Sequence, residues 1–403
     1  MKIKIKDISG GINSVPGYKA LGVRAGLKKA NKPDLAMIIC EKPVVTAGIF
    51  TRNRVCAAPV KVAKTKINRG FKRLVLINSG NANACTGDNG IIAVKRIEKY
   101  TSKKFNIKEG EIISCSTGII GQQLPVEKIF AGVDKLAEKL AKGDYSDAAK
   151  AIMTTDTFEK EVALEVRVGS LTSFRVAGFA KGAGMIAPNM ATMLAFIVTD
   201  CSLKRATLRN IMRECAERTF NRITVDGDMS TNDTVLCLAS TTDKESIGNE
   251  NKIIFAFKSA ISVCMERLAR MIVADGEGAT KLIEVEVVNA KTENDAKKIA
   301  SKIANSNLFK TAVYGESPNW GRIIAAAGAA GVKIDDDKID IAFGNIKTVR
   351  KGIAVQGTTQ KLRSYLKEKI IKITVNINKG SYSCKFLTCD MTPEYVKINA
   401  EYS

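Results

Sequence analysis

Thr192 follows a stretch of sequence that could let the protein cut its own chain and expose this threonine as a new N-terminus. A threonine inside a chain is a poor nucleophile, whereas an N-terminal threonine has a free α-amine that can serve as the base for its own hydroxyl. The preceding residues supply a flexible Gly-x-Gly backbone, a Pro-Asn bend and the small residue Ala191. Attack of the Thr192 hydroxyl on the Ala191 carbonyl carbon would split the chain between them. The alternative is an ordinary threonine in a loop that leads into a core strand, and spacing alone favours it because short motifs match by chance.

The sequence contains no histidine, and this absence restricts the chemistry. It removes the commonest general base and excludes Ser-His-Asp and Cys-His catalytic arrangements. A hydrolase or transferase built from this chain therefore needs a lysine, a carboxylate or a terminal amine as its base. The α-amine of Thr192 meets that need.

Motifs distributed along the whole chain resemble those of the ornithine acetyltransferase family, also called glutamate N-acetyltransferase, of the arginine pathway. The central motif is KGAGMIAPNMATML at 181–194, in which family members cut themselves between the alanine and the threonine. The others, in family order, are GIFTRN at 48–53, NSGNANACTG at 78–87, STGIIG at 116–121, TTDT at 154–157, DGDMSTND at 226–233, ADGEGAT at 274–280, SPNWGR at 317–322 and INA at 398–400. A set this long and this ordered is a highly specific signal.

The resemblance implies an α/β fold of the α+β type, layered as helix, sheet, sheet and helix. The nucleophile would begin a central strand, as in N-terminal-nucleophile enzymes. Self-cleavage would give an alpha chain, 1–191, and a beta chain, 192–403, which together form one catalytic unit. The family also implies a heterotetramer of two alpha and two beta chains. Periodicity alone predicts only a mixed α/β protein.

The implied reaction is acetyl transfer from N-acetylornithine to glutamate. The free α-amine of Thr192 has an ordinary pKa of about 7.7–8.0, so a useful fraction is unprotonated near neutrality. Attack on N-acetylornithine would form an acetyl-threonine ester and release ornithine, and glutamate would then take the acetyl group, which gives ping-pong kinetics. No metal or cofactor is implied. Some family members also use acetyl-CoA as a donor, and no residue here separates the two kinds.

The resemblance assigns Thr117 and Gly118 to an oxyanion hole, where a backbone N–H lies beside a hydroxyl. One such donor typically contributes roughly 10²–10³ in rate. On the residues alone this motif is better explained as a plain β-turn, since turns containing glycine are common. The substrate contacts that the family implies are Thr154, Lys181, Thr192, Glu277, Asn399 and the C-terminal residue, Ser403.

Two of these contacts are charged: Lys181 would pair with the substrate carboxylate, and Glu277 with an ammonium group of ornithine or glutamate. On the residues alone, both fit solvated surface charges. The doublet Thr154–Thr155 leaves open which hydroxyl faces the substrate. The chain also ends earlier than is common in the family, with Ser403 where threonine is usual.

The composition is that of an ordinary globular protein, with 403 residues of which 45% are hydrophobic. The first residues alternate charged and apolar side chains like a half-buried strand, unlike a signal peptide, and no apolar run approaches membrane-spanning length. The 10 cysteines form no C-x-x-C pair and lie mostly among apolar neighbours. They are expected to be reduced core residues, and the protein to be cytoplasmic.

The net charge of +22 raises the hypothesis of nucleic-acid binding. Lysine and arginine are spread singly and in pairs, however, and aromatic residues make up only 6% of the chain. A solvated lysine-rich surface explains the charge better, with no nucleic-acid partner expected. Such a positive field can help to recruit anionic substrates such as glutamate.

Hydrophobic periodicity predicts alternating strands and helices in both parts of the chain. Strands are predicted at 35–39, 44–50, 74–78, 193–198 and 282–288, with a hairpin over 162–168 and 173–179. Helices are predicted at 126–140, 146–153, 208–215, 253–273, 296–303 and 320–330. The C-terminal part, 371–389, is predicted to be a hairpin with its turn at 378–380.

Two other classes of function compete with the transferase. An N-terminal-nucleophile amidohydrolase or aminopeptidase would use the same cleavage and the same ester but pass the acyl group to water. A non-enzymatic binding protein would show no self-cleavage. The acceptor-site motifs favour the transferase.

Overall fold

The computed structural model describes residues 3–29, 31–169, 172–187, 193–241 and 250–401. Ala191, Thr192 and Ser403 lie outside these residues. The chain forms two compact units: unit 1 comprises Met1–Gly182, Asn189–Asn221 and Met229–Ile272, and unit 2 comprises Ala183–Pro188, Arg222–Asp228 and Val273–Ser403. Segments from both sides of the expected cut contribute to each unit.

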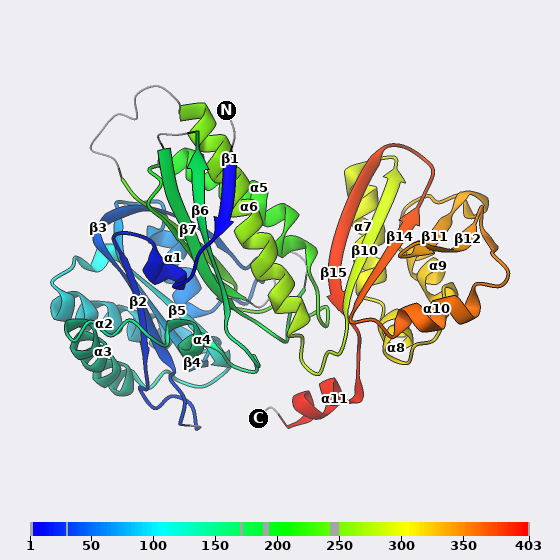
Figure 1. Ribbon diagram of the computed structural model, residues 1–403. Coiled ribbons are helices and arrows are strands. Elements are labelled where there is room, and N and C mark those ends of the chain that lie inside the picture. The colour runs from blue at the N-terminus through cyan, green and yellow to red at the C-terminus, as the bar shows by residue number, and fades with distance from the viewer. Residues whose placement is uncertain (1–2, 30, 170–171, 188–192, 242–249, 402–403) are drawn as a thin grey trace. The chain divides into compact units, whose positions relative to one another are not determined.

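Unit 1 is built on a 9-stranded sheet (Figure 1). Its strands are β1 (Ile3–Asp7), β2 (Tyr18–Val23), β3 (Leu35–Phe50), β4 (Lys72–Asn81), β5 (Ile112–Ile119), β6 (Lys160–Val168), β7 (Thr172–Lys181), β8 (Leu194–Thr199) and β9 (Thr234–Ala239). The order is β1-β6-β7-β8-β9-β3-β4-β5, and β2 pairs with β3. The predicted hairpin is confirmed, because β6 and β7 pair antiparallel from Lys160 opposite Ala180 to Val168 opposite Thr172.

The long strand β3 belongs to two layers. Its first half pairs with β2 and β4, the register shifts between Ile39 and Val44, and its second half pairs with β9. One hydrophobic core collects buried side chains from both halves of the sheet: Ile38, Val75, Ile113, Phe179, Phe196 and Leu236. The two sheet layers therefore face each other across this core.

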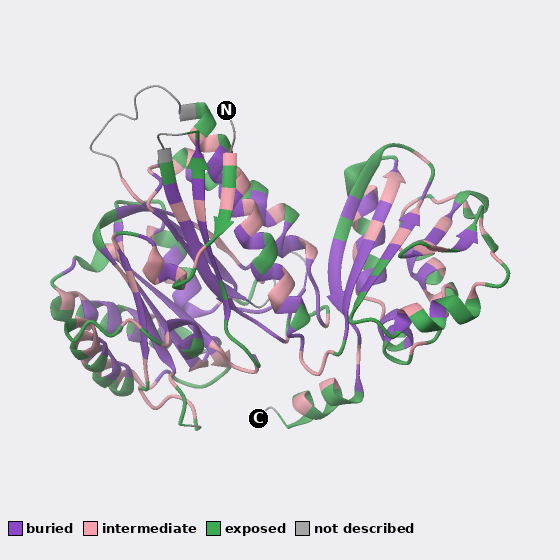
Figure 2. Ribbon diagram, in the orientation of Figure 1, coloured by how far each residue is buried: buried purple, intermediate pink, exposed green. Residues whose placement is uncertain are grey.

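Helices cover the outer faces of the two layers. Because side chains alternate along a strand, Leu35, Met37 and Leu74 point away from the central core and pack with α2 (Gly87–Phe105) and α3 (Val126–Ala141). On the other layer, α5 (Arg205–Arg218) lies against β3 and β9. The ring of Phe257 in α6 (Glu250–Ala274) lies 6.4 Å from that of Phe174 in β7. The predicted order of helix, sheet, sheet and helix is confirmed, and Figure 2 shows the strands as largely buried.

Unit 2 has a 6-stranded sheet of order β13-β12-β11-β14-β10-β15. Its strands are β10 (Leu282–Ala290), β11 (Asp340–Phe343), β12 (Ile346–Arg350), β13 (Ile353–Ala354), β14 (Ile370–Asn376) and β15 (Tyr382–Cys389). Its helices are α7 (Glu293–Ala304), α8 (Asn307–Tyr314), α9 (Gly321–Gly328), α10 (Thr359–Leu366) and α11 (Pro393–Ala400). Helix α7 begins where the Thr292 hydroxyl accepts a 3.1 Å hydrogen bond from the Asp295 N–H.

The predicted C-terminal hairpin is wrong. β10 lies between β14 and β15, parallel to the first and antiparallel to the second. The amides of Lys379 and Gly380 donate to the carbonyl of Asn289 at the end of β10, at 2.8 and 2.9 Å. The turn is where the sequence predicts it, but it crosses the end of a third strand, which a local turn signal does not reveal.

The strands predicted separately at 35–39 and 44–50 are the two halves of β3. The remaining predicted elements agree with the structure, and several helices go beyond the predictions. The predicted helices at 126–140, 253–273 and 296–303 match α3, α6 and α7, and that at 320–330 matches α9. The predicted helix at 146–153 is the shorter α4 (Ala148–Ile152). Helices α1 (Ala58–Lys66), α2, α8, α10 and α11 were not predicted.

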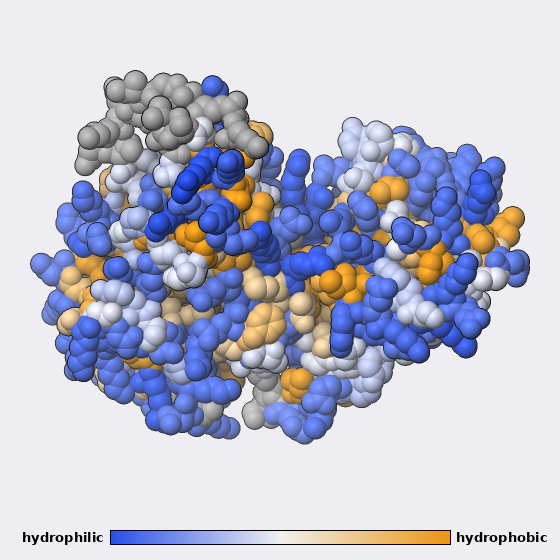
Figure 3. Space-filling model, viewed as in Figure 1, coloured by the Kyte–Doolittle hydropathy of each residue, from blue (hydrophilic) through white to orange (hydrophobic). Residues whose placement is uncertain are grey.

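The surface and the cysteines agree with the composition. Hydrophilic residues cover most of the face shown in Figure 3, and hydrophobic ones appear in small groups. All ten cysteines are free thiols; eight are buried, whereas Cys56 is half-buried and Cys85 exposed. In the part of the chain that is described, no helix has the length and apolar character to cross a membrane.

Candidate active site

The start of β8 is held in place directly after Thr192. The N–H of Met193 donates to Oδ1 of Asp233 at 3.1 Å. The Met193 carbonyl accepts from the N–H of Thr234, also at 3.1 Å. All six residues of β8, between β7 and β9, are buried. Whatever conformation the preceding residues take, the residue bonded to Thr192 has a fixed backbone.

Asp233 is a buried residue beside the candidate nucleophile to which the sequence analysis assigned no role, although it ends the motif at 226–233. Its side chain is fully buried, and its Oδ2 has no hydrogen-bond partner within the described ranges. Burial raises the pKa of this carboxyl well above its usual value, against the opposing effects of the Met193 N–H, Thr51 and Lys181. A buried polar atom without a partner is uncommon in folded proteins and marks a site of interest.

Thr117 and Gly118 lie at the end of β5, not in a β-turn. β5 runs parallel to β4, with Gly118 opposite Gly80, and the register shifts at Asn81. Gly118 has a φ of 132°, and a Cβ there would lie 2.3 Å from the carbonyl carbon of Gly80. Only glycine fits this close approach of two backbones. The plain-turn interpretation is therefore wrong for this motif.

Asn232 connects the end of β5 with the start of β8. Its Nδ2 donates to the carbonyls of Ala82 at 2.7 Å and Ser116 at 2.8 Å. The residue before Thr117 is thus held by Asn232, and the residue after Thr192 by Asp233. Two adjacent side chains of one motif thus hold the residue before the candidate oxyanion donors and the residue after the candidate nucleophile.

A buried carboxylate, Asp156, brings Thr154 and Lys181 together. It accepts from the Thr154 N–H at 2.9 Å and the Gly182 N–H at 2.6 Å. Its oxygens lie 2.7 Å from Nζ of Lys160 and 3.9 Å from Nζ of Lys181. Burial alone would raise the pKa of Asp156, but the two lysines bring it down to about 2.

Burial within this cluster shows whether Lys181 is a solvated surface charge. The residue is 3% exposed, so its interpretation as a solvated surface charge is wrong. Thr154 and Thr155 are both half-buried, so burial does not distinguish their hydroxyls.

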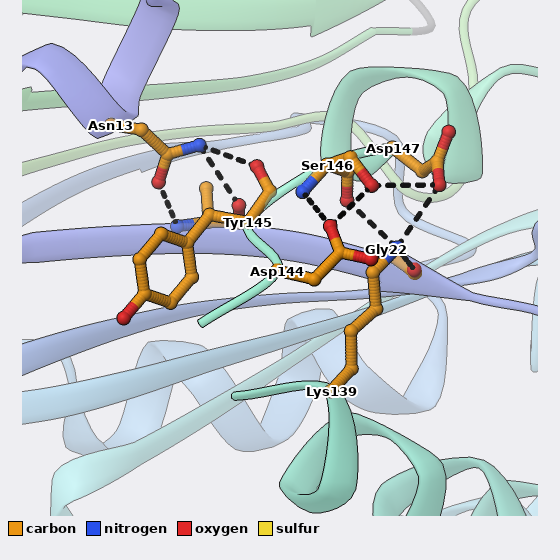
Figure 4. A network of polar contacts seen from close by, with 8 residues as sticks. Asn13, Gly22, Lys139, Asp144, Tyr145, Ser146 and Asp147 are labelled. Carbon is orange, nitrogen blue, oxygen red and sulfur yellow. Dashed lines mark hydrogen bonds and ion pairs between the residues drawn. The ribbon is translucent and has the colours of Figure 1, made fainter. Parts of the chain in front are cut away.

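A polar network fixes the segment that leads to Thr154 (Figure 4). Nδ2 of Asn13 donates to the Tyr145 carbonyl at 2.8 Å. Nζ of Lys139 in α3 donates to the Gly22 carbonyl in β2 at 2.9 Å and to Asp147 at 3.0 Å. The residues before α4 are thereby tied to β2, and α4 then leads directly into the Thr154 segment.

Glu277 and Asn399, both in unit 2, are brought together as a pair. Nδ2 of Asn399 in α11 donates to Oε2 of Glu277 at 2.8 Å. The Glu277 N–H donates to the Ala183 carbonyl at 2.9 Å, and a Cβ on Gly184 would lie 2.3 Å from the Glu277 carboxylate. The chain upstream of the expected cut therefore passes close to this carboxylate, and a side chain at position 184 would displace it. Glu277 is half-buried and not a fully solvated charge.

Asp226 holds the same upstream segment from another direction. It accepts from the N–H groups of Met185 at 2.6 Å and Ile186 at 2.9 Å. The Tyr395 hydroxyl donates to it at 3.3 Å. Burial raises the pKa of Asp226. No cluster of three or more Asp, Glu or Cys side chains among the described residues could hold a metal ion.

The predicted site residues are thus distributed over both units. Unit 1 contains Thr117, Gly118, Thr154 and Lys181, and unit 2 contains Glu277 and Asn399. Unit 1, with two sheet layers between helices and an anchored strand that follows a candidate threonine nucleophile, has the organisation of an N-terminal-nucleophile enzyme.

The model of the ArgJ family matches residues 19–403, and the chain belongs to this family. The Arginine biosynthesis bifunctional protein ArgJ of Caldanaerobacter subterraneus subsp. tengcongensis is 45% identical over 400 residues, which cover 98% of this chain and 99% of that one. The Glutamate N-acetyltransferase of Methanocaldococcus jannaschii is 44% identical over 414 residues, covering 99% of this chain and all of that one. These two differently named relatives are almost equally similar.

A solved structure from Mycobacterium tuberculosis is that of an ornithine acetyltransferase complexed with ornithine. The two chains are 36% identical, and the match has a TM-score of 0.41. It covers 46% of this chain and 98% of the solved chain.

Proposed function

We propose that the protein is a glutamate N-acetyltransferase that moves an acetyl group from N-acetylornithine to glutamate, after cutting its own chain between Ala191 and Thr192. Two observations carry this proposal together. Asp233 holds the N–H of Met193, the residue after Thr192, and β5 ends where Gly118 lies against Gly80. Family membership supplies the substrate class, because relatives that match nearly the full chain are named for arginine biosynthesis and for glutamate acetylation.

In the first half-reaction the α-amine of Thr192 removes the hydroxyl proton, and Oγ attacks the acetyl carbonyl carbon of N-acetylornithine. The resulting oxyanion accepts hydrogen bonds from Thr117 and Gly118. The carbon–nitrogen bond breaks, and the proton held by the α-amine passes to the departing nitrogen of ornithine. An acetyl-threonine ester remains.

In the second half-reaction the unprotonated α-amine of glutamate attacks the ester carbon through the same oxyanion arrangement. The threonine oxygen leaves and recovers a proton, and N-acetylglutamate is released. Lys181 would bind the α-carboxylate that both substrates have. Glu277, held by Asn399 and joined by the C-terminal Ser403, would bind an ammonium group, since a buried ammonium without a partner costs several kcal/mol.

Mass spectrometry tests both the cut and the ester. We expect wild-type protein to give two fragments, 1–191 and 192–403, and Thr192→Ala to give one uncut chain. N-acetylornithine alone should add one acetyl group to the second fragment, and glutamate should remove it. The same labelling with acetyl-CoA shows whether a thioester is a second donor.

Two outcomes would contradict the proposal. An active wild type that remains a single full-length chain would exclude the N-terminal nucleophile. Release of free acetate without acetylglutamate would favour the amidohydrolase or aminopeptidase alternative.

The proposal extends to assembly and location. The reaction needs no bound cofactor, because Thr192 itself carries the acetyl group. Two alpha and two beta chains would form a heterotetramer, which sedimentation of the cleaved protein would measure. A cytoplasmic location is supported by the ten free cysteines, since disulfides are rare in reducing compartments.

A further inference from the structure

Lys28 is a half-buried cation in unit 1 next to the candidate oxyanion segment. Among the described residues its Nζ donates only to backbone carbonyls, those of Pro33 at 3.0 Å and Ala151 at 3.5 Å. Its stem lies against Gly80, where a Cβ would be 3.1 Å from Cγ of Lys28. Gly80 is in turn paired with Gly118. Lys28 therefore lies one backbone away from the candidate oxyanion donors.

The backbone of Lys28 is rigidly placed by Asp34. This fully buried carboxylate accepts hydrogen bonds from four successive N–H groups of 25–28, at 2.6, 3.0, 2.6 and 3.1 Å. Asp34 is thereby satisfied by the backbone and makes no hydrogen bond with the Lys28 ammonium. Asp34 therefore fixes the backbone of this loop without forming an ion pair with the Lys28 side chain.

The charges around Lys28 leave an excess of positive charge. Asp156 forms ion pairs with Lys160 and Lys181. Within the described part of the chain, no carboxylate lies within ion-pair distance of the Lys28 ammonium. Burial, and then the charge of Lys181, lower the pKa of Lys28 to about 8, while Asp34 and Asp156 oppose this shift. A partly desolvated ammonium that a second positive charge also disfavours is stabilised by an anion.

We propose that Lys28 binds the side-chain carboxylate of the acceptor glutamate and so selects glutamate as acceptor. This inference rests on the proposed function. Donor and acceptor share an α-carboxylate, which Lys181 would bind, and they differ at the other end, where ornithine has an ammonium and glutamate a second carboxylate. A second lysine that contacts only the glutamate end would attract this carboxylate and so favour glutamate as acceptor.

The test compares acceptors in the full-length, cleaved enzyme. We expect Lys28→Met to raise KM for glutamate by about 10–100-fold, the loss of one hydrogen bond to a charged group. The preference for glutamate over glutamine should fall by a similar factor, while KM for N-acetylornithine changes less than about 2-fold. Lys28→Arg, which keeps the charge, should retain most of the preference.

Lys128→Met is the matched control, because Nζ of Lys128 also donates to a carbonyl of this loop, that of Gly26 at 2.9 Å. It should leave the glutamate-to-glutamine preference unchanged. An unchanged preference in Lys28→Met, or an equal rise in KM for both substrates, would overturn the inference. Failure of the wild type to transfer acetyl at all would instead remove the proposed function on which it rests.

A measurement on the wild type covers the case in which Lys28→Met does not fold. Glutamate should protect Lys28 from reductive methylation, read by peptide mass spectrometry, and glutamine at the same concentration should protect it less. Equal protection by the two amino acids would overturn the inference.

Discussion

At the residue scale, Gly118 illustrates how one missing Cβ positions a hydrogen-bond donor. Gly118 lies so close to Gly80 on the neighbouring strand that its backbone has no room for a side chain. The N–H of Gly118 is consequently part of a rigid sheet. Rigid donors are worth more in catalysis than mobile ones, because they need no reorganisation when charge develops.

We expect Gly118→Ala to destabilise the protein by about 1–3 kcal/mol, from strain at positive φ and from the backbone clash. Acetyl transfer should fall by about 10²-fold or more, because a donor is displaced. Gly121→Ala is the control, since its φ of 88° is also positive but nothing lies within 4 Å of its added Cβ. Urea unfolding and transfer rates check both variants, and equal losses in the two would show that φ strain alone is responsible.

At the scale of elements, the carboxylate of Asp156 joins the Thr154 segment after α4 to β6 and β7. Its folded-state pKa of about 2 lies below the ordinary value of 3.8. The ionised carboxylate therefore stabilises the fold fully above pH of about 4, and this contribution is lost as the pH falls through 2.

Asp156→Asn should lower the free energy of unfolding at pH 7 by about 3–5 kcal/mol, because two buried ammonium groups lose the opposite charge of this carboxylate. The difference from wild type should shrink between pH 4 and 2. The exposed pair of Asp134 and Lys104, at 2.7 Å, supplies the control: Asp134→Asn should cost about 1 kcal/mol or less. Denaturant titrations at several pH values measure both, and a pH-independent difference would contradict this role for Asp156.

Elements with a strong local pattern could be predicted from the sequence. α3 and α6 have apolar residues at helical spacing, and the hairpin of β6 and β7 has alternation around a glycine turn. The insertion of β10 between β14 and β15 could not be predicted, because pairing partners are distant in sequence. Asp156 and Asp233 escaped assignment for the same reason: their partners Gly182 and Met193 lie 26 and 40 residues away.

The resemblance identified the motifs. The structure shows which residues of these motifs hold other residues in place through hydrogen bonds. Thr117, Gly118, Lys181, Glu277 and Asn399 were named from the sequence, and their immediate surroundings are now visible. The supporting residues Asn232 and Asp233 were inside a quoted motif without a role. A motif indicates that residues matter together, whereas hydrogen bonds show which of them positions which.

At the scale of the whole molecule, the central sheet of unit 1 combines strands from both sides of the expected cut. β8 and β9 follow Thr192, yet they lie between β7 and β3, which precede it. All residues of β8 and β9 are buried. Separating the fragments would break two ladders of backbone hydrogen bonds and expose the core.

We therefore expect the cleaved fragments to co-elute in gel filtration without a covalent link. They should also unfold together in one urea transition of unit 1, since neither has a complete sheet alone. Uncut Thr192→Ala is the control and should unfold close to the same midpoint when both proteins are at micromolar concentration. Separation of the fragments in native buffer would contradict the observed strand order.

The position of β8 would also set the order in which the expected folding and cutting occur. While the chain is continuous, the short connection from β7 keeps β8 near its slot at an effective concentration in the millimolar range. Cutting an unfolded chain would turn strand insertion into an encounter between two separate, aggregation-prone polypeptides. A threonine that becomes reactive only where Asp233 has anchored its neighbour would delay the cut until the strand is in place. Only chains whose central sheet has already folded would then be cut.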